Sequence, residues 1–113
     1  MYPSGPWKGF WHQDGFGRQE MEQFELHFST DGTVRGQGSD MVGVFTFRGH
    51  YEPANGTILM TKQYLGKHTV EYAGRPDGEG KIVGEWNIRE VWRGPFSLHP
   101  VVGGDLPIQE IVR

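Results

Sequence analysis

The stretch VFTFRGHYEPANGTILMTKQY, residues 44–64, consists of two runs of residues separated by an Asn-Gly pair. In the first run, Phe45 and Phe47 alternate with polar residues, and this period of two is typical of a strand with one buried face. Asn55-Gly56 favours a two-residue hairpin turn, because both residue types tolerate the positive φ that such a turn requires. Pairing across that turn points four residues of the second run inward: Ile58, Met60, Lys62 and Tyr64. The stretch therefore predicts a β-hairpin.

Turn signals of the same kind recur along the whole chain at nearly even spacing. They are DGFG (14–17), STDG (29–32), DMVG (40–43), PANG (53–56), LGK (65–67), PDGEG (76–80) and VWRG (91–94). Between them lie eight segments predicted to be strands, at roughly 6–13, 19–29, 33–40, 43–52, 57–65, 68–75, 81–90 and 94–101. No window favours a helix, because even GRQEMEQFELHF resolves into alternation from Gln23 onward. The chain is therefore predicted to be all-β.

Eight consecutive strands joined by short turns form a meander, which leaves two unpaired edges unless the sheet closes on itself. Closure predicts an eight-stranded antiparallel up-and-down β-barrel, a single domain over about 6–101. Side chains can just fill such a barrel, or it can hold one small ligand. Interior glycines at 36, 38, 49 and 84 fit strands that coil sharply. The tail 102–113 falls outside the meander and is expected to pack on the barrel or to reach a partner.

The composition narrows the classes of partner and compartment. The net charge is −3 and the 11 basic residues are scattered, whereas nucleic-acid binding needs a clustered basic surface. No run approaches the ~20 apolar residues of a membrane helix, and the start MYPSGPWKGF lacks the pattern of a secretory signal. The chain has no cysteine, which excludes disulfides and thiolate chemistry and suits a reducing compartment. We therefore expect a cytoplasmic protein with neither a nucleic-acid nor a membrane partner.

Several segments, taken in order, resemble the calycin superfamily of small barrels, and its avidin/streptavidin branch more than the lipocalins. They are GFWHQ (9–13), DGTVRGQGSD (31–40), FTFRGHYEP (45–53), KQYLGKHTVEYAG (62–74) and IVGEWNI (82–88). The resemblance is one of pattern, covers roughly residues 9–100 and implies the same eight-stranded barrel.

The ligand contacts of that family carry over only in part. Trp11 and Gln13 match a core tryptophan and an amide contact, and Trp86 matches a further tryptophan. Four positions depart from the pattern: Gly38 for a tyrosine, Met60 for a tryptophan, Glu71 for a threonine and Pro100 for a carboxylate. Biotin binding is therefore not expected, and likeness of fold does not by itself assign a function.

The connection after Leu65 decides which residues of the following strand enter the barrel. A two-residue Gly66-Lys67 turn pairs Lys62 with Glu71 and points Thr69 inward. Lys62 and Glu71 then form an opposite-charge pair inside an aromatic barrel. Such a pair is costly to bury unless its groups satisfy each other or bind something polar.

A three-residue turn at 66–68 is the alternative. It shifts the register by one residue, which flips every side chain of the strand that follows. Val70 and Tyr72 then point inward, and Glu71 becomes an ordinary solvated charge. The two-residue turn is the preferred interpretation because the family resemblance favours the same register.

The other residues that carry chemistry in proteins form no recognisable constellation. Trp7, Trp11 and Trp86 are interpreted as core plugs first, since aromatic residues dominate cores by their buried area. The five histidines form neither HxH nor HExxH, so we expect no metal and no cofactor. No serine has a histidine and an acid nearby in the arrangement of a catalytic triad.

Three functions remain open. The leading hypothesis is a non-enzymatic module that binds a small ligand at one open end of the barrel. Its site would be lined by Trp11, Gln13, Met60, Lys62, Thr69, Glu71 and Trp86. The second is a filled structural or protein-interaction barrel that forms a homo-oligomer through outward residues such as Leu59, Leu65 and Val83. The third is an enzyme that uses Lys62 or Glu71 as acid or base. A cavity of ~300 Å³ or more favours the first over the second.

Overall fold

A computed structural model describes residues 2–101, so the predicted behaviour of the tail at 102–113 lies outside the described residues. The chain forms eight strands. They are β1 (Gly5–Gln13), β2 (Gly17–Phe28), β3 (Thr33–Asp40), β4 (Gly43–Tyr51), β5 (Ile58–Tyr64), β6 (Thr69–Pro76), β7 (Ile82–Ile88) and β8 (Trp92–Pro100).

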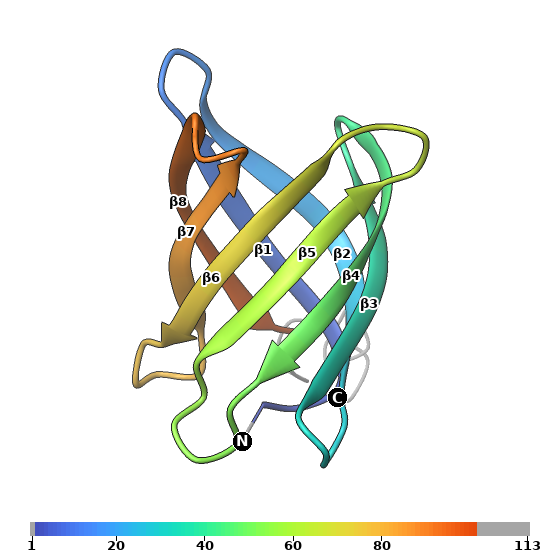
Figure 1. Cartoon of the computed structure of the whole chain (residues 1–113), viewed down its shortest axis with the longest axis vertical. Coiled ribbons are helices and arrows are strands. Elements are labelled where there is room, and N and C mark those ends of the chain that lie inside the picture. The colour runs from blue at the N-terminus through green and yellow to red at the C-terminus, as the bar shows by residue number, and fades with distance from the viewer. Residues whose placement is uncertain (1, 102–113) are drawn as a thin grey trace, which may run out of the picture.

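Each strand pairs antiparallel with the next along the chain, and β8 returns to pair with β1, so the sheet is a closed barrel (Figure 1). The closing ladder runs from Trp7 opposite Pro100 to Trp11 opposite Phe96. Closure leaves no edge strand available for another chain. The predicted eight-stranded antiparallel meander barrel is confirmed.

The two ends of the barrel differ. At one end lie the connections β1–β2, β3–β4, β5–β6 and β7–β8, at the top of Figure 1, and we call this the open end. At the other end, Tyr2 donates a hydrogen bond to the carbonyl of Gly56 and packs against Trp7, Phe28 and Tyr51. We call this the capped end, because the Tyr2 ring closes it.

Large apolar side chains fill most of the barrel interior. Trp7 is fully buried and Trp86 nearly so, as expected of core plugs, whereas Trp11 is half-buried. The buried apolar residues are Tyr2, Trp7, Met21, Phe24, Leu26, Phe28, Val34, Phe45, Phe47, Ile58, Met60, Tyr64, Val70, Tyr72, Ile82, Trp86, Phe96 and Leu98. Neighbouring rings meet mainly edge to face, for example Phe47 and Tyr72 at 5.5 Å between centroids, which is a favoured arrangement of aromatic pairs.

The registers of two hairpins differ from the expected ones. In β4–β5, Tyr51 lies opposite Ile58 rather than Met60, because four residues, 53–56, form the connection instead of two. An even number of added residues leaves the inward set unchanged, so Met60 and Lys62 face inward as predicted.

In β5–β6 the preferred register is wrong. Lys62 lies opposite Val70, and Glu71 lies opposite Thr61 on the outer face. The connection is three residues long, 65–67, with Lys67 N–H donating to the Tyr64 carbonyl. A connection with an odd number of residues reverses which side chains of the following strand face inward, so Val70 and Tyr72 point into the barrel, as in the alternative interpretation. That alternative placed the three-residue turn at 66–68, one residue later than it lies.

The β7–β8 turn also differs from its sequence signal. β7 ends at Ile88 and β8 begins at Trp92, so the turn is 89–91 and contains only the first residue of the VWRG segment, Val91. Arg89 and Glu90 adopt positive φ angles of 53° and 62°. Such turns usually contain glycine or asparagine, which is why the sequence signal pointed elsewhere.

The coiling of the barrel depends on glycines where neighbouring strands approach closely. A Cβ atom on Gly84 would collide with the Ala73 carbonyl oxygen and lie 2.7 Å from the Gly74 Cα. On Gly49, a Cβ would lie 2.5 Å from the Met60 Cα. Because the obstructing atoms are backbone, a larger residue would push the strands apart.

We therefore expect Gly84→Ala to lower the free energy of unfolding by about 1–3 kcal/mol, the usual cost of overpacking. Thr46→Ala, on the exposed face of β4, is the control and should cost less than about 1 kcal/mol. Urea denaturation of the two variants measures both values. Equal costs would show that strand spacing at Gly84 is not constrained.

Candidate functional site

An ion pair lies inside the barrel toward the open end. Lys62 on β5 and Asp40 at the end of β3 bring Nζ and Oδ2 within 2.6 Å, and neither side chain is exposed to solvent. Transfer of two charges out of water is favourable only when each finds enough hydrogen-bond partners. The surroundings of both groups therefore decide whether the pair is compatible with the fold.

The carboxylate of Asp40 is fully engaged. Its Oδ2 accepts from Lys62 Nζ and, at 2.6 Å, from the Tyr64 hydroxyl. Its Oδ1 accepts from the backbone N–H of Val42 at 2.9 Å. The Val42 bond comes from the short β3–β4 turn, so the position of the carboxylate is set by local backbone geometry as well as by its partner.

The ammonium group of Lys62 also finds several partners. Its Nζ donates to the Tyr72 hydroxyl at 3.4 Å and lies 3.9 Å from the Met21 sulfur. The same atom lies 4.3 Å from the centre of the Phe45 ring and 4.8 Å from that of Tyr64. Aromatic faces attract a desolvated cation, so the rings around Lys62 contribute to its stabilisation.

This setting shifts the pKa values of all the titratable groups involved. Burial lowers the pKa of Lys62 to about 8, although Asp40 opposes that shift. Burial alone would raise the pKa of Asp40, but the Lys62 charge and the hydrogen bonds from Lys62, Tyr64 and Val42 outweigh it and lower the pKa. Burial and the nearby Asp40 charge raise the pKa values of Tyr64 and Tyr72. At neutral pH the pair is therefore ionised and the tyrosines are neutral.

A partly enclosed cavity of about 180 Å³ lies at the open end of the barrel. Tyr64 and Tyr72, which bind the ion pair, line it together with residues from β1, β6, β7 and two connections. The lining residues are Trp11, Gln13, Val42, Tyr64, His68, Val70, Tyr72, Trp86 and Ile88. The cavity is thus mostly aromatic and aliphatic, with a few polar groups.

One residue that lines the cavity has a polar group without a partner. The indole Nε1 of Trp11 is shielded from solvent and, among residues 2–101, has no hydrogen-bond acceptor. Trp86, whose ring meets Trp11 at 5.8 Å and 79°, donates instead to the His12 carbonyl at 3.0 Å. A buried donor without an acceptor costs about 1–3 kcal/mol. An acceptor atom placed near Trp11 Nε1 would remove that cost.

The structure brings together some of the predicted site residues and separates others. Trp11, Gln13 and Trp86 line the cavity. Met60 is buried in the core and Lys62 is held by Asp40, so neither lines it. Thr69 and Glu71 are on the exposed outer face of β6, which is a correction that follows from the three-residue turn. The acid–base pair of Lys62 and Glu71 does not form, because the two lie on opposite faces of the barrel wall.

The sequence interpretation missed Asp40 as the partner of Lys62. The glycines at 36 and 38 are expected inside the barrel, and Val34 fits the same alternation. Asp40 is the next residue of that alternation, two positions after Gly38, and it is buried. The signal was therefore present in the sequence. It was hidden because Asp40 also begins the DMVG turn, where aspartate is an ordinary turn residue.

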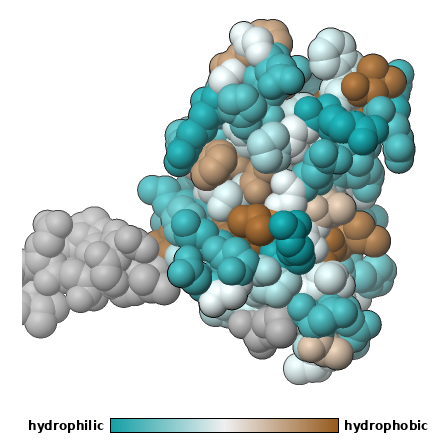
Figure 2. Space-filling model, turned by 90° about the vertical axis from the view of Figure 1, so that its left-hand side faces the viewer, coloured by the Kyte–Doolittle hydropathy of each residue, from teal (hydrophilic) through white to brown (hydrophobic). Residues whose placement is uncertain are grey.

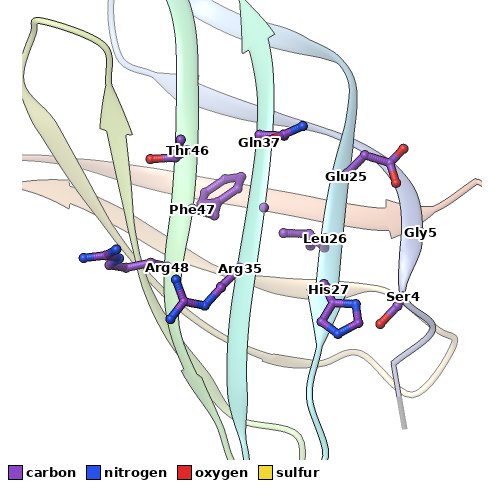
Figure 3. Close-up of a pocket in the computed structure, with 11 residues that line it drawn as sticks. Ser4, Gly5, Glu25, Leu26, His27, Arg35, Gln37, Thr46, Phe47 and Arg48 are labelled. Atoms are coloured by element: carbon purple, nitrogen blue, oxygen red, sulfur yellow. The ribbon is translucent and has the colours of Figure 1, made fainter.

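A second hollow, about 650 Å³ and open to solvent, lies on the outer face of β2, β3 and β4 (Figure 3). Arg35 lies directly opposite Arg48 on one side and His27 on the other, and the labelled side chains of Figure 3 project from neighbouring strands. Neither arginine forms an ion pair within the described part of the chain. All three side chains are exposed, so bulk water screens them, and we treat this face as a solvated surface.

Comparison of the chain with protein-family models, curated proteins and solved structures finds no match in any of the three. The described residues contain no helix that is both long and apolar enough to span a membrane. They also contain no group of three or more metal-ligating side chains.

Replacing either member of the ion pair should destabilise the protein strongly. Lys62→Met or Asp40→Asn alone leaves one buried charge without its partner, at a cost of about 3–5 kcal/mol. The double variant should recover much of that loss, because no unpaired charge remains. Chemical denaturation of the two single variants and the double variant measures the coupling.

Glu71→Gln serves as the control for this cycle. Glu71 is exposed and accepts from the Thr61 hydroxyl at 2.9 Å, so its replacement should cost less than about 1 kcal/mol. Mild and additive effects of the Lys62 and Asp40 variants would contradict the buried pair.

The protonation of Lys62 should be visible as a function of pH. Its pKa is lowered from 10.5 to about 8 by burial, so the folded protein loses this proton before the unfolded chain does. Between about pH 8 and 10.5 the unfolded chain binds more protons, and the Lys62 contribution to stability should rise with pH. The ¹³Cε chemical shift of Lys62 reports the midpoint directly. A midpoint at or above 10.5 would mean that attraction by Asp40 outweighs burial.

Proposed function

We propose that the protein is a non-enzymatic binding module that holds one small cyclic molecule with a hydrogen-bond acceptor at the open end of the barrel. The observation that carries this proposal is the partly enclosed aromatic cavity beside the unpaired indole donor of Trp11. The closed eight-stranded meander is compatible with the calycin pattern, and we include that superfamily and a cytoplasmic location in the proposal.

The size of the cavity limits the ligand. Pockets for drug-sized molecules measure about 300–1,000 Å³, whereas a buried apolar cavity of about 150 Å³ holds one benzene molecule. The volume of about 180 Å³ therefore suits one ring with a short substituent. The walls supply ring faces and branched aliphatic groups, which favour a flat or compact apolar body.

The polar groups of the cavity favour a neutral ligand that accepts hydrogen bonds. Trp11 lines the cavity and its indole N–H has no acceptor, so a small turn of the ring would bring an unused donor to the ligand. The Tyr72 hydroxyl accepts from Lys62, which leaves its own hydrogen available as a second donor. Asp40 and Lys62 neutralise each other below the cavity, so the site presents no free charge to attract an ion. A carbonyl oxygen on a small ring matches these requirements.

Biotin remains an unsuitable ligand in this proposal. The avidin/streptavidin branch binds biotin through contacts that are replaced in this chain at Gly38, Met60, Glu71 and Pro100. Glu71 on the outer face and Met60 in the core are both absent from the cavity lining. The expectation of no useful biotin affinity therefore stays a prediction.

The second candidate function is a filled barrel that associates with other proteins or with itself. Most of the interior is filled and the cavity lies below the size expected for a drug-sized ligand, which favours this alternative. Leu59 on the outer wall is 68% exposed and supplies an apolar contact. Failure of every small-ring probe to bind, together with a stable oligomer in solution, would select it.

Binding is tested with cyclohexanone and 2-piperidone as probes, and with methylcyclohexane as the control that lacks a carbonyl. The Trp11 indole resonance in ¹H–¹⁵N spectra should shift with the carbonyl probes and change less with methylcyclohexane, because only a carbonyl accepts from it. Biotin should produce no saturable shift in the same experiment.

Two variants locate the site. Val70→Phe fills the cavity and should abolish probe binding, whereas Leu59→Phe on the outer wall is the matched control and should leave it unchanged. Trp11→Phe removes the donor and should weaken the carbonyl probes by about threefold to tenfold, the value of one hydrogen bond. Probe binding that survives Val70→Phe would contradict the proposed site.

A further inference from the structure

Each connection at the open end exposes a large apolar side chain. Phe16, Met41, Leu65 and Val91 are between 71% and 77% exposed, and each belongs to a different connection. Trp92, which follows Val91 at the start of β8, is 57% exposed. We call these five residues the apolar tips. Turns mostly contain glycine, proline, asparagine, aspartate and serine, so the gathering of five large apolar side chains at one end of the barrel points to a surface that meets a partner.

The capped end has the opposite character. Its three connections bear the acidic residues Asp31, Glu52, Asp77 and Glu79 against one basic residue, Lys81. Among residues 2–101, the exposed large hydrophobic side chains other than the apolar tips are Val44, at the second position of β4 next to the open end, and Leu59 further along the barrel wall on β5. The molecule therefore has one apolar end and one acidic end, an asymmetry along the barrel axis.

Basic residues slightly outnumber acidic ones near the apolar tips. Lys67, Arg89 and Arg93 lie at the open end, against Asp14 and Glu90, and Arg93 also lies 3.8 Å from the Glu85 carboxylate. Arg89 adopts a positive φ in its turn, a conformation that glycine or asparagine adopts more readily. Long basic side chains beside apolar ones can extend their charges to the headgroups of a lipid layer while their stems stay in apolar surroundings.

The arrangement of the tips favours lipid over a protein surface. A protein partner needs one continuous and closely fitting patch, commonly about 800 Å² on each side. Here the tips are on four separate connections at the open end (Figure 1), and Figure 2 shows apolar side chains at the upper end set among polar ones. Fluid acyl chains can surround such separate projections, and aromatic residues are enriched where a protein meets the lipid interface.

We propose that the open end docks on the surface of an anionic phospholipid bilayer, with the apolar tips inserted and the cavity mouth facing the lipid. The sequence predicts no membrane partner because it contains no run long enough to span a bilayer. Docking on a membrane surface needs no such run, and the exposed tips that it requires become apparent only in the folded barrel. The proposed docking surface consists of the apolar tips and the charged residues beside them, and it does not include the cavity. Vesicle binding can therefore succeed even if no small ring binds in the cavity.

Vesicles of phosphatidylcholine with phosphatidylglycerol test the docking. Trp92 is the tryptophan among the tips, whereas Trp7, Trp11 and Trp86 lie in the barrel, so a blue shift of emission on adding vesicles reports insertion. Trp92→Phe should remove most of that shift and keep binding in a sedimentation assay. Phe16→Ser and Leu65→Ser should each weaken vesicle partitioning on the order of tenfold. Lys67→Gln should weaken it a few fold, and only on the anionic vesicles.

Leu59→Ser is the matched control, because Leu59 is equally apolar and 68% exposed but lies on the barrel wall. It should leave partitioning unchanged, and thermal unfolding should show that all the variants are folded. Equal loss with Leu59→Ser would overturn the proposal in favour of non-specific adsorption. No vesicle binding would also overturn it, and concentration-dependent dimers that Leu65→Ser disrupts would identify a second copy of the chain as the occupant instead.

Discussion

The ion pair between Lys62 and Asp40 constrains the upper half of the barrel. A lysine this deep in an aromatic interior is tolerated because a carboxylate lies 2.6 Å from its nitrogen. The Tyr72 hydroxyl also accepts from Lys62, and the Tyr64 hydroxyl donates to Asp40. The residues that satisfy the pair are also the residues that shape the space above it. Tyr64 and Tyr72 bind the pair with their hydroxyls and line the cavity with their side chains. The pair therefore fixes where the packed core ends and the open end begins.

That arrangement explains why the two ends of the barrel differ. Toward the capped end, Tyr2, Trp7 and Phe28 close the interior with rings in contact. Toward the open end, the neutralised pair forms a floor that needs no further partner, and Trp11 is left with an unused donor in the wall. The open end thus combines a small cavity with an unsatisfied group, and its surrounding connections expose apolar side chains. The same asymmetry supports the two proposals for this end, the binding of a small ring and docking on a lipid surface.

The sequence was sufficient for the fold and only partly sufficient for the site. Alternation at Phe45, Phe47 and the residues after them predicts strands regardless of exact turn length, so the barrel could be derived. The facing of β6 could not, because it depends on whether the connection after Tyr64 holds two residues or three. With three residues, Glu71 lies on the outer face and cannot reach Lys62. The partner of Lys62 is Asp40 from β3 instead. Turn length is weakly encoded locally, and here the tertiary preference for burying Val70 and Tyr72 decides it.

The central claim is that Lys62 is charged, shielded from water and bound to Asp40 in the folded protein. Direct detection of the Lys62 ammonium protons by ¹H–¹⁵N NMR near neutral pH tests it, because solvent-exposed ammonium protons exchange too fast to give sharp signals. The account predicts a protected Lys62 signal that disappears in Asp40→Asn and persists in Glu71→Gln. A Lys62 signal as fast in exchange as those of the surface lysines, or one unaffected by Asp40→Asn, would contradict it.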